Sequence, residues 1–354
     1  MVYHIAQALK SWYSWLNVFH YVSVRAIAAL LTSLFLSFAF GNQFIAFCQS
    51  YFRTKVRDWT PESHQAKNDT PTMGGLFILL VFFLSCLVWC DLSQIKVWIF
   101  FLCMIGFGGI GFLDDWAKIK NKKGISASLK FRLQIFIALL VSSLWYFLVC
   151  TDTRICVPFV KSFNPDLGIF LIPWAAYIMI ATSNAVNLTD GLDGLATGPL
   201  LCSVASFSII CYLAGHILFS QYLFIPFMHT AELTVIGASL FGSLLGFLWY
   251  NTYPAQIFMG DVGSLPLGAG LALMALMTRQ ELLLLISGGI FVLETVSVIL
   301  QVVSFKLRGK RIFKMAPIHH HFELKGWPES RITIRFWIIS LILSLFAILT
   351  LKLR

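Results

Sequence analysis

The sequence predicts an all-α integral membrane protein with about ten transmembrane helices. Two observations predict this class. Hydrophobic residues make up 58% of the 354-residue chain and charged residues only 12%, which is about half the charge of a soluble domain. Apolar runs long enough to cross a bilayer also recur along the whole sequence. No repeat, linker or low-complexity segment divides the chain, so residues 1–354 are expected to form a single polytopic domain.

The apolar runs define the expected spans in chain order. A membrane-spanning helix needs roughly 20 apolar residues, because it rises about 1.5 Å per residue. The expected spans are 22–50, 74–90, 97–113, 132–149, 167–183, 195–214, 233–249, 263–278, 282–304 and 332–351. Polar joins of varied charge separate these spans, and they decide the orientation of the chain.

The distribution of basic residues predicts that orientation. Most of the 26 Lys and Arg residues lie in the first, third and ninth joins between spans. Because cytoplasmic loops carry the excess of Lys and Arg, the odd-numbered joins are expected in the cytoplasm and both termini in the periplasm. Joins five and seven also face the cytoplasm in this topology, although they contain neither Lys nor Arg. They carry Asp190, Asp193 and Asp261 instead.

The segment 184–194 is the polar break in an otherwise apolar stretch. Asn184, Asn187, Asp190 and Asp193 recur there at every third residue. On a helix these side chains would spiral over one half of the cylinder. Uncompensated carboxylates at a membrane boundary are costly, so this segment requires a cation, a basic loop or water close by.

Carboxylates gather at the expected cytoplasmic ends of the spans. The five are Asp114, Asp115, Asp190, Asp193 and Asp261. Adjacent carboxylates repel, and a divalent cation commonly relieves that repulsion. Lysine-rich loops beside them favour a site that holds Mg²⁺ and phosphate together. The alternative is that each Asp only caps a helix or forms a turn, which explains five on one face less well.

Two further motifs leave alternatives open. The turn Thr70–Gly75 offers hydroxyls and a close backbone approach for a phosphate or a base. Thr-Pro also simply starts helices, and for the turn taken alone we favour this structural interpretation.

The run His319, His320 and His321 lacks the spacing and the cysteines typical of structural zinc. A solvated run remains an alternative, and we favour contact with a phosphate or leaving group.

The ninth span carries a polar stripe. Its members are Ser287, Glu294, Ser297, Gln301 and Ser304. A polar stripe facing lipid is implausible, so the stripe is expected to line a cavity or to pack on another helix. Glu294 lies near the middle of the span and is either functional or paired inside the bundle.

Together these motifs resemble those of the polyprenyl-phosphate N-acetylhexosamine-1-phosphate transferase superfamily and, within it, the phospho-N-acetylmuramoyl-pentapeptide-transferase family. The pair Asp114-Asp115 and the segment 184–194 resemble the superfamily at large. The turn at 70–75 and the run Pro-Ile-His-His-His-Phe-Glu at 317–323 are similar to this family in particular. The similarity covers nearly the whole chain. One departure is Asp69, where the family usually has Gly before the turn.

The resemblance implies an enzyme of the bacterial cytoplasmic (inner) membrane with its active site on the cytoplasmic face. The implied reaction transfers phospho-N-acetylmuramoyl-pentapeptide from UDP-N-acetylmuramoyl-pentapeptide to undecaprenyl phosphate. The products would be lipid I and UMP, in the first membrane step of peptidoglycan synthesis and hence of cell-wall biogenesis, cell shape and cell division. The resemblance also implies Mg²⁺ as cofactor and a homodimer, and no nucleic-acid partner is expected.

Roles for individual residues follow from the same resemblance. Asp261 is expected to bind Mg²⁺, with Asp190 as a second ligand, and Asp114 or Asp115 is the implied base for the lipid phosphate. The expected catalytic residues are Asp114, Asp115, Asp261 and His320. The expected substrate-binding residues are Lys67, Thr72, Lys118, Lys122, Lys130, Asn187, Asp190, Asp193, Asn251, Phe258, Gln301, His319 and His321.

Three rival functions differ in what they require. A sister transferase acting on UDP-N-acetylglucosamine would share the Asp motifs but not the His run or the Thr-Pro-Thr turn. A cation-coupled transporter would place its carboxylates near the middle of the bilayer, whereas here only Glu294 is deep. A structural scaffold would not need five carboxylates on one face.

Overall fold

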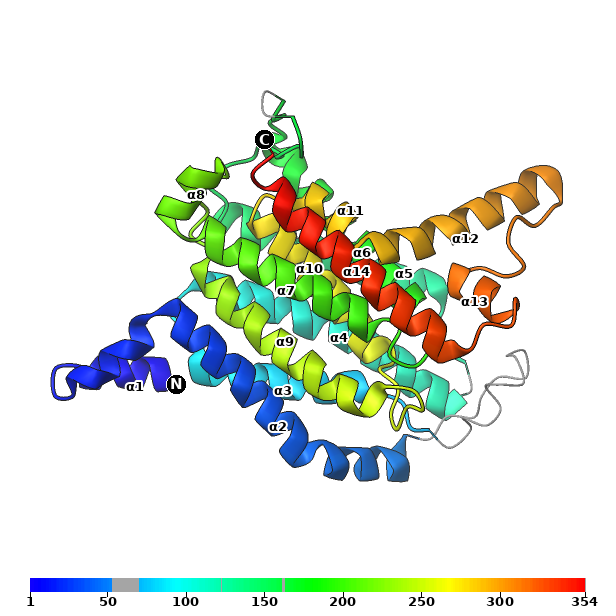
Figure 1. The fold of residues 1–354 in the computed structure, drawn as a ribbon, viewed down its shortest axis with the longest axis horizontal. Helices are drawn as coiled ribbons and strands as arrows, with labels where there is room; N and C mark the ends of the chain where they lie inside the picture. Colours follow the sequence, from blue (N-terminus) through cyan, green and yellow to red (C-terminus); the bar gives the residue numbers. More distant parts are fainter. Residues whose placement is uncertain (53–69, 122, 161–162, 354) are drawn as a thin grey trace.

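The protein is a bundle of long helices. The computed structural model describes residues 1–52, 70–121, 123–160 and 163–353. These residues contain helices and no β-strand, with an isolated antiparallel bridge between Arg154 and Asp166. Figure 1 shows that most of the long helices run side by side along one common direction. The all-α membrane class expected from the sequence is confirmed.

The helices follow the apolar runs. Their bounds are α1 Val2–Leu9, α2 Val22–Tyr51, α3 Gly74–Trp89, α4 Ile95–Asn121, α5 Ala127–Leu148, α6 Leu171–Thr189, α7 Thr197–Ala214, α8 Ile217–Leu223, α9 Ala231–Asn251, α10 Asp261–Met277, α11 Leu284–Ser287, α12 Gly289–Arg308, α13 Ile318–Glu323 and α14 Glu329–Thr350. Short 3₁₀ turns occupy Ser14–His20, Gly168–Phe170 and Glu281–Leu283.

Within the described ranges, eight helices are long and apolar enough to cross a membrane. The helices α3 and α10 are apolar but shorter. Each of the ten expected spans overlaps one of these helices. The total of ten crossings and the periplasmic placement of the termini stay predictions.

The ninth expected span differs from the structure. It is not one helix, because α11 ends at Ser287 and α12 begins at Gly289. The two adjacent glycines, Gly288 and Gly289, are poor helix formers, and the chain changes direction there. In Figure 1, α12 leaves the bundle and projects beyond it, and only 22% of its apolar window is buried. Hydropathy detects the apolar run but not this change of direction.

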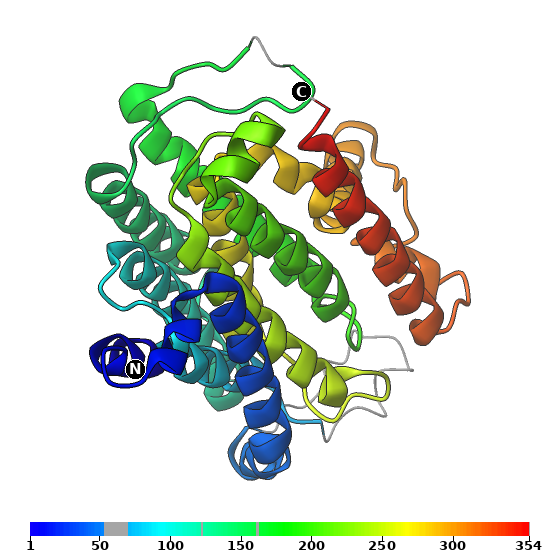
Figure 2. The same ribbon diagram turned by 60° about the vertical axis from the view of Figure 1, so that its left-hand side comes forward.

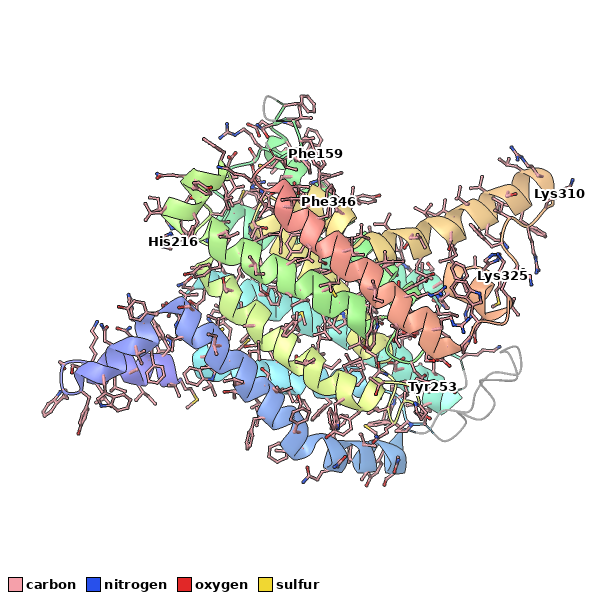
Figure 3. All side chains as sticks on the ribbon, viewed as in Figure 1. Phe159, His216, Tyr253, Lys310, Lys325 and Phe346 are labelled. Carbon is pink, nitrogen blue, oxygen red and sulfur yellow. The ribbon has the colours of Figure 1, made fainter. Side chains whose placement is uncertain are left out.

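The helix α10 forms the centre of the bundle. It packs against α3, α4, α6 and α7, and nearly all of its residues are buried. Figure 2 shows the N-terminal helices on one side of the molecule, with α12 and α14 on the other. Figure 3 shows Tyr253 and Lys325 at one end of the bundle and Phe159 and His216 at the opposite end. The first of these ends carries the described parts of two basic joins that the sequence placed in the cytoplasm, between α4 and α5 and between α12 and α14.

A buried ion pair joins α2 to α9. Arg25 Nη2 donates to Glu232 Oε2 at 3.0 Å, and 3% of Arg25 and 2% of Glu232 are exposed. The Asp91 amide donates to Glu232 Oε1 at 2.6 Å, and the Arg25 guanidinium lies over the Tyr3 ring. A buried charge is tolerated only when it is paired and hydrogen-bonded, so each member of this pair requires the other.

We expect Arg25→Ala to lower the free energy of unfolding by about 3–5 kcal/mol, because Glu232 would remain buried without its cation. Thermal unfolding in detergent measures the loss. Arg154→Ala is the control, since Arg154 pairs with Asp152 at the surface and 62% of its side chain is exposed, and exposed pairs contribute little. Equal falls in melting temperature for the two variants would contradict the role of the buried pair.

Candidate active site

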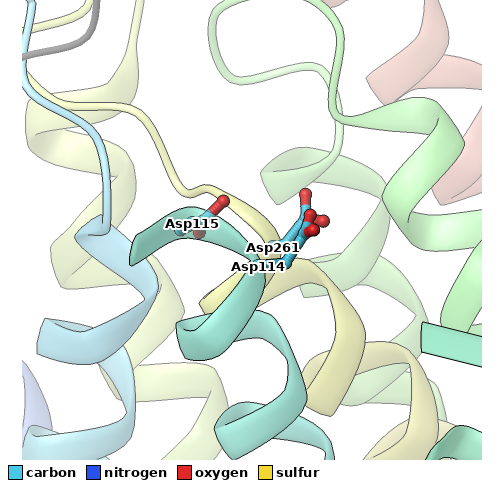
Figure 4. Close-up of side chains that lie close together, drawn as sticks. All are labelled: Asp114, Asp115 and Asp261. Carbon is cyan, nitrogen blue, oxygen red and sulfur yellow. The ribbon is translucent and has the colours of Figure 1, made fainter. Parts of the chain in front are cut away.

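Three carboxylates converge at the end of the bundle that carries the basic loops. Asp114 and Asp115 come from α4, and Asp261 is the first residue of α10. Figure 4 shows the three side chains close together. Each offers an oxygen, and these oxygens all lie within 4.8 Å of one another. The expectation that residues far apart in the sequence meet here is therefore confirmed for these three.

A glycine allows this convergence. Gly111 lies one helical turn before Asp115, and its Cα faces the backbone of α10. A Cβ at this position would lie 2.1 Å from the Asp261 carbonyl oxygen. The helices α4 and α10 can therefore approach closely only because residue 111 has no side chain. The sequence analysis placed the Asp pair at the end of a span, but α4 continues to Asn121, so the pair lies within the helix.

Backbone amides hold one oxygen of each carboxylate in the Asp pair. The Val262 amide donates to Asp115 Oδ2 at 3.0 Å. The Ile125 amide donates to Asp114 Oδ1 at 2.9 Å. Val262 lies in the first turn of α10, where the helix dipole favours a negative charge. The other oxygen of each carboxylate faces a lysine.

Two lysines neutralise much of the carboxylate charge. Lys118 Nζ lies 2.8 Å from Asp114 Oδ2, 3.1 Å from Asp115 Oδ1 and 3.1 Å from Asp261 Oδ2. Lys130, from α5, contacts Asp261 Oδ2 and lies 3.5 Å from Asp114 Oδ2. The formal charges of three carboxylates and two ammonium groups sum to one negative charge. The cluster therefore still attracts a cation.

Residues at the C-terminal end of α6 surround the carboxylate cluster. Asn187 Nδ2 donates to Asp261 Oδ1 at 2.9 Å and to Ser264 Oγ at 2.8 Å. Asp190 follows directly after α6. Burial, together with the charges of Asp261 and Asp115, raises the pKa of the Asp190 carboxyl to about 7. Asp190 is thus close enough to the cluster for the charges of Asp261 and Asp115 to raise its pKa.

The donor set of the cluster fits Mg²⁺. All three side chains offer oxygen, the ligand type that Mg²⁺ prefers. The Lys118 ammonium meets one oxygen from each of the three, which shows that a cation can contact them together. The expected ligand Asp261 belongs to this group. Asp114 and Asp115 are its other members, and Asp190 as a metal ligand stays a prediction.

The Thr-Pro-Thr turn lies against the cluster. At Gly260, which has a φ of +73°, a Cβ would lie 2.5 Å from Asp115 Oδ2 and 3.0 Å from Thr72 Oγ1. Thr72 is therefore beside the Asp115 carboxylate. The first amides of α3 are not available to a phosphate in this structure. Gly74 N donates to Phe258 O and Gly75 N to Met259 O, both at 2.8 Å.

Asp193 and Asn251 are buried and form hydrogen bonds with other residues of the protein. Asp193 Oδ2 accepts from the Ala255 amide at 3.0 Å. Asn251 Oδ1 accepts from Thr197 Oγ1, and Asn251 Nδ2 donates to Ile257 O, both at 2.9 Å. These bonds hold the 190–196 turn against the 252–258 loop. Contact of Asp193, Asn251 and Phe258 with a nucleotide stays a prediction.

The three histidines of α13 point to different partners. His319 Nδ1 lies 3.1 Å from Glu294 Oε1, and His320 Nδ1 lies 2.8 Å from Glu323 Oε2. His321 Nδ1 accepts from the Lys314 amide, and burial together with the charges of Lys325 and Lys314 lowers the pKa of His321. Among the described residues, none of the three bonds to the carboxylate cluster, so a catalytic role for His320 stays a prediction.

Gln301, another expected substrate-binding residue, bonds to the loop after α12 and not to the cluster. The amide of Gln301 is engaged at both ends, because Oε1 accepts from the Ile312 and Phe313 amides and Nε2 donates to Phe313 O, each at 3.0 Å. Gln301 thus ties the loop after α12 back onto that helix. Lys67 and Lys122 lie outside the described residues.

The sequence analysis did not single out Gly111, Gly260 or Ser264. These residues position the carboxylates without touching a ligand. The sequence does contain a signal for such positions: small residues in a membrane helix favour close contact with a neighbouring helix.

An apolar cleft lies beside α12. Its volume is about 370 Å³, and residues of α11, α12 and the loop before α13 line it. Leu285, Val292, Val296, Leu300, Phe313 and Ile318 are among them. Ile318 is the neighbour of His319, so the cleft begins next to the His run.

A comparison with known families identifies the fold and chemistry. The profile of glycosyl transferase family 4 matches residues 97–279, which is more than half of the chain. The chain belongs to glycosyl transferase family 4. The region that matches family 4 contains all three clustered carboxylates. A phospho-N-acetylmuramoyl-pentapeptide-transferase signature matches residues 67–79, which include the Thr-Pro-Thr turn. The protein is therefore a family 4 enzyme of the phospho-N-acetylmuramoyl-pentapeptide-transferase type, and a phospho-sugar transferase.

We expect Gly111→Ala to reduce transferase turnover about 100-fold, because a displacement of reacting groups by about 1 Å can cost that much. The added methyl group would push α4 away from the Asp261 backbone. Gly109→Ala is the matched control on the same helix, since a Cβ there meets no atom within 4 Å. Turnover and thermal unfolding would be measured on both variants. Unchanged turnover in the Gly111 variant would contradict the role of this helix contact.

Proposed function

We propose that the protein transfers phospho-N-acetylmuramoyl-pentapeptide from UDP-N-acetylmuramoyl-pentapeptide to undecaprenyl phosphate, giving lipid I and UMP. The observation that carries this proposal is the cluster of Asp114, Asp115 and Asp261 with two lysines, in a chain that has the Thr-Pro-Thr signature. Attack of one phosphate on another brings several negative charges together. A cluster that binds cations and presents ammonium groups matches this requirement.

Asp114, Asp115 and Asp261 would hold a Mg²⁺ ion. When bound, the ion would neutralise and polarise the diphosphate of the nucleotide substrate. Lys118 and Lys130 would then turn from the carboxylates to phosphate oxygens, since both ammonium groups already lie at the cluster. Asn187 would keep Asp261 oriented through its hydrogen bond to Oδ1.

The role of Asp114 is mainly electrostatic in this proposal. A phosphate monoester is already largely ionised at neutral pH, so the attacking lipid phosphate has little need of a strong base. In the structure, Asp114 Oδ1 accepts from a backbone amide and Oδ2 faces Lys118. Both oxygens are thus engaged in holding charge and position.

The apolar cleft beside α12 supports a lipid substrate. Its lining is aliphatic and aromatic, which suits an isoprenoid chain. The cleft lies next to His319, and His319 lies against the 190–194 turn. A lipid held there would have its phosphate on the side of the carboxylates. Function in the bacterial inner membrane, in peptidoglycan synthesis, and as a homodimer belongs to the same proposal.

We expect purified protein in detergent to release UMP from UDP-N-acetylmuramoyl-pentapeptide only when undecaprenyl phosphate and Mg²⁺ are both present. UDP-N-acetylglucosamine, offered separately, should give no UMP. Release from UDP-N-acetylglucosamine instead would assign the chain to the sister transferases. If neither nucleotide gave UMP, in protein whose folding is verified by thermal unfolding, the result would favour a transporter.

We expect Asp114→Asn to keep most of its turnover, whereas removal of a general base typically costs about 100- to 10,000-fold. Asp261→Ala is the comparison, and it should abolish the response of turnover to Mg²⁺ concentration. A titration of rate against Mg²⁺ and pH for both variants measures this. A complete loss in Asp114→Asn, rescued at higher pH, would restore the base role.

A further inference from the structure

Glu294 is a fully buried carboxylate that the proposed transfer does not use. It lies in α12 with 0% of its surface exposed, although α12 is mostly exposed. Its partner is His319 of α13, which is 1% exposed, and the two meet at 3.1 Å between Oε1 and Nδ1. A buried carboxylate is costly unless it is compensated, so Glu294 depends on its contact with His319.

The other members of the polar stripe bind elsewhere. Ser287 lies near Ser206 and Ser344, and Ser297 donates to the Glu294 carbonyl. Gln301 holds the loop after α12, as described above, and Ser304 donates to the Lys310 carbonyl. Among these described contacts, Glu294 makes the one that reaches the His run.

The chemistry of the pair determines where a proton lies. An ionised carboxylate only accepts hydrogen bonds. With Glu294 as the carboxylate anion, the Nδ1 atom of His319 carries a proton and donates it to Glu294. This arrangement leaves Nε2 as the ring atom that faces away from α12.

The Nε2 atom faces the turn that carries Asp190. A Cβ at Gly191 would lie 2.4 Å from His319 Nε2. In the described part of the chain, neither Nε2 nor Glu294 Oε2 has a hydrogen-bond partner. The imidazole thus forms a wedge between α12 and the 190–194 turn, with a polar edge directed at that turn.

We propose that Glu294 is a positioning residue for the transfer reaction, which keeps the proton of His319 on Nδ1 and presents Nε2 to the Asp190–Gly194 turn. The carboxylate fixes both the tautomer and the ring orientation, as outer partners of functional histidines do. Through this ring, α12 and the apolar cleft are connected to the turn beside the carboxylate cluster. The kinetic part of the proposal rests on the proposed function.

The decisive variant is Glu294→Gln, which has the same shape. Because an amide both donates and accepts, it allows either tautomer of His319, whereas the carboxylate allows one. A purely packing role would survive this change. We expect kcat to fall about 10- to 100-fold, the usual effect of losing such an outer partner. Thr295→Ala is the matched control, since Thr295 only donates to the Phe291 carbonyl within the same helix.

A readout independent of activity is ¹⁵N NMR of histidine-labelled protein, with the His319 signals assigned by their absence in His319→Ala. We expect a protonated Nδ1 in the wild-type protein and a mixture of tautomers in Glu294→Gln. In the His319→Ala background, Glu294→Gln should cause no further loss of kcat, because Glu294 acts through the ring.

The proposal is overturned if wild-type His319 carries its proton on Nε2 alone. It is also overturned if Glu294→Gln changes only one of tautomer and kcat, or if the variant loses as much kcat without His319 as with it. If the Glu294→Gln variant fails to fold, the tautomer of His319 in the wild-type protein still tests the proposal. Absence of UMP release by the wild-type protein would defeat the proposed function, while the NMR result would still test the Glu294–His319 interaction.

Discussion

The close approach of α4 and α10 is the constraint on which the site depends. Gly111 leaves no room for a methyl group against the Asp261 backbone, and this contact sets the carboxylates of two helices side by side. Three like charges at this distance repel strongly, since the energy of a charge pair rises as the surroundings become less polar. The packing of an apolar bundle therefore holds together groups that electrostatics alone would separate.

Lysines make that arrangement tolerable without a bound ion. The Lys118 ammonium bridges the three carboxylates, and Lys130 reaches two of them from α5. The same lysines are the groups that a phosphate substrate would attract. Binding of a metal and of a phosphate would thus exchange partners within one cluster: the ion takes the carboxylates and the lysines take the phosphates.

The bundle is incomplete on the side of α12. After the break at Gly288 this helix packs against α6 and α14, its far part projects from the bundle, and the apolar cleft lies along it. The first turn of α12 buries Ile290 and Phe291 in the bundle. Farther along, Gln301 holds the following loop, and Glu294 contacts α13 through His319. These contacts explain why a mostly lipid-facing helix carries a stripe of polar side chains.

The sequence by itself determined the membrane class, the approximate positions of the spans and the gathering of acidic residues at one end of the bundle. Hydropathy, charge and motif spacing are local properties, so they can be read from the sequence without knowledge of the fold. Only the tertiary structure decided that Asp114, Asp115 and Asp261 each contact Lys118 through one carboxylate oxygen. Asp190 is not part of this three-carboxylate cluster. The tertiary structure also decided that Asp193 accepts from the Ala255 amide, that Asn251 bonds to Thr197 and Ile257, and that the ninth span divides into two helices. Those outcomes depend on which helix faces meet and how closely their backbones approach, and that information is carried by pairs of residues far apart in the chain.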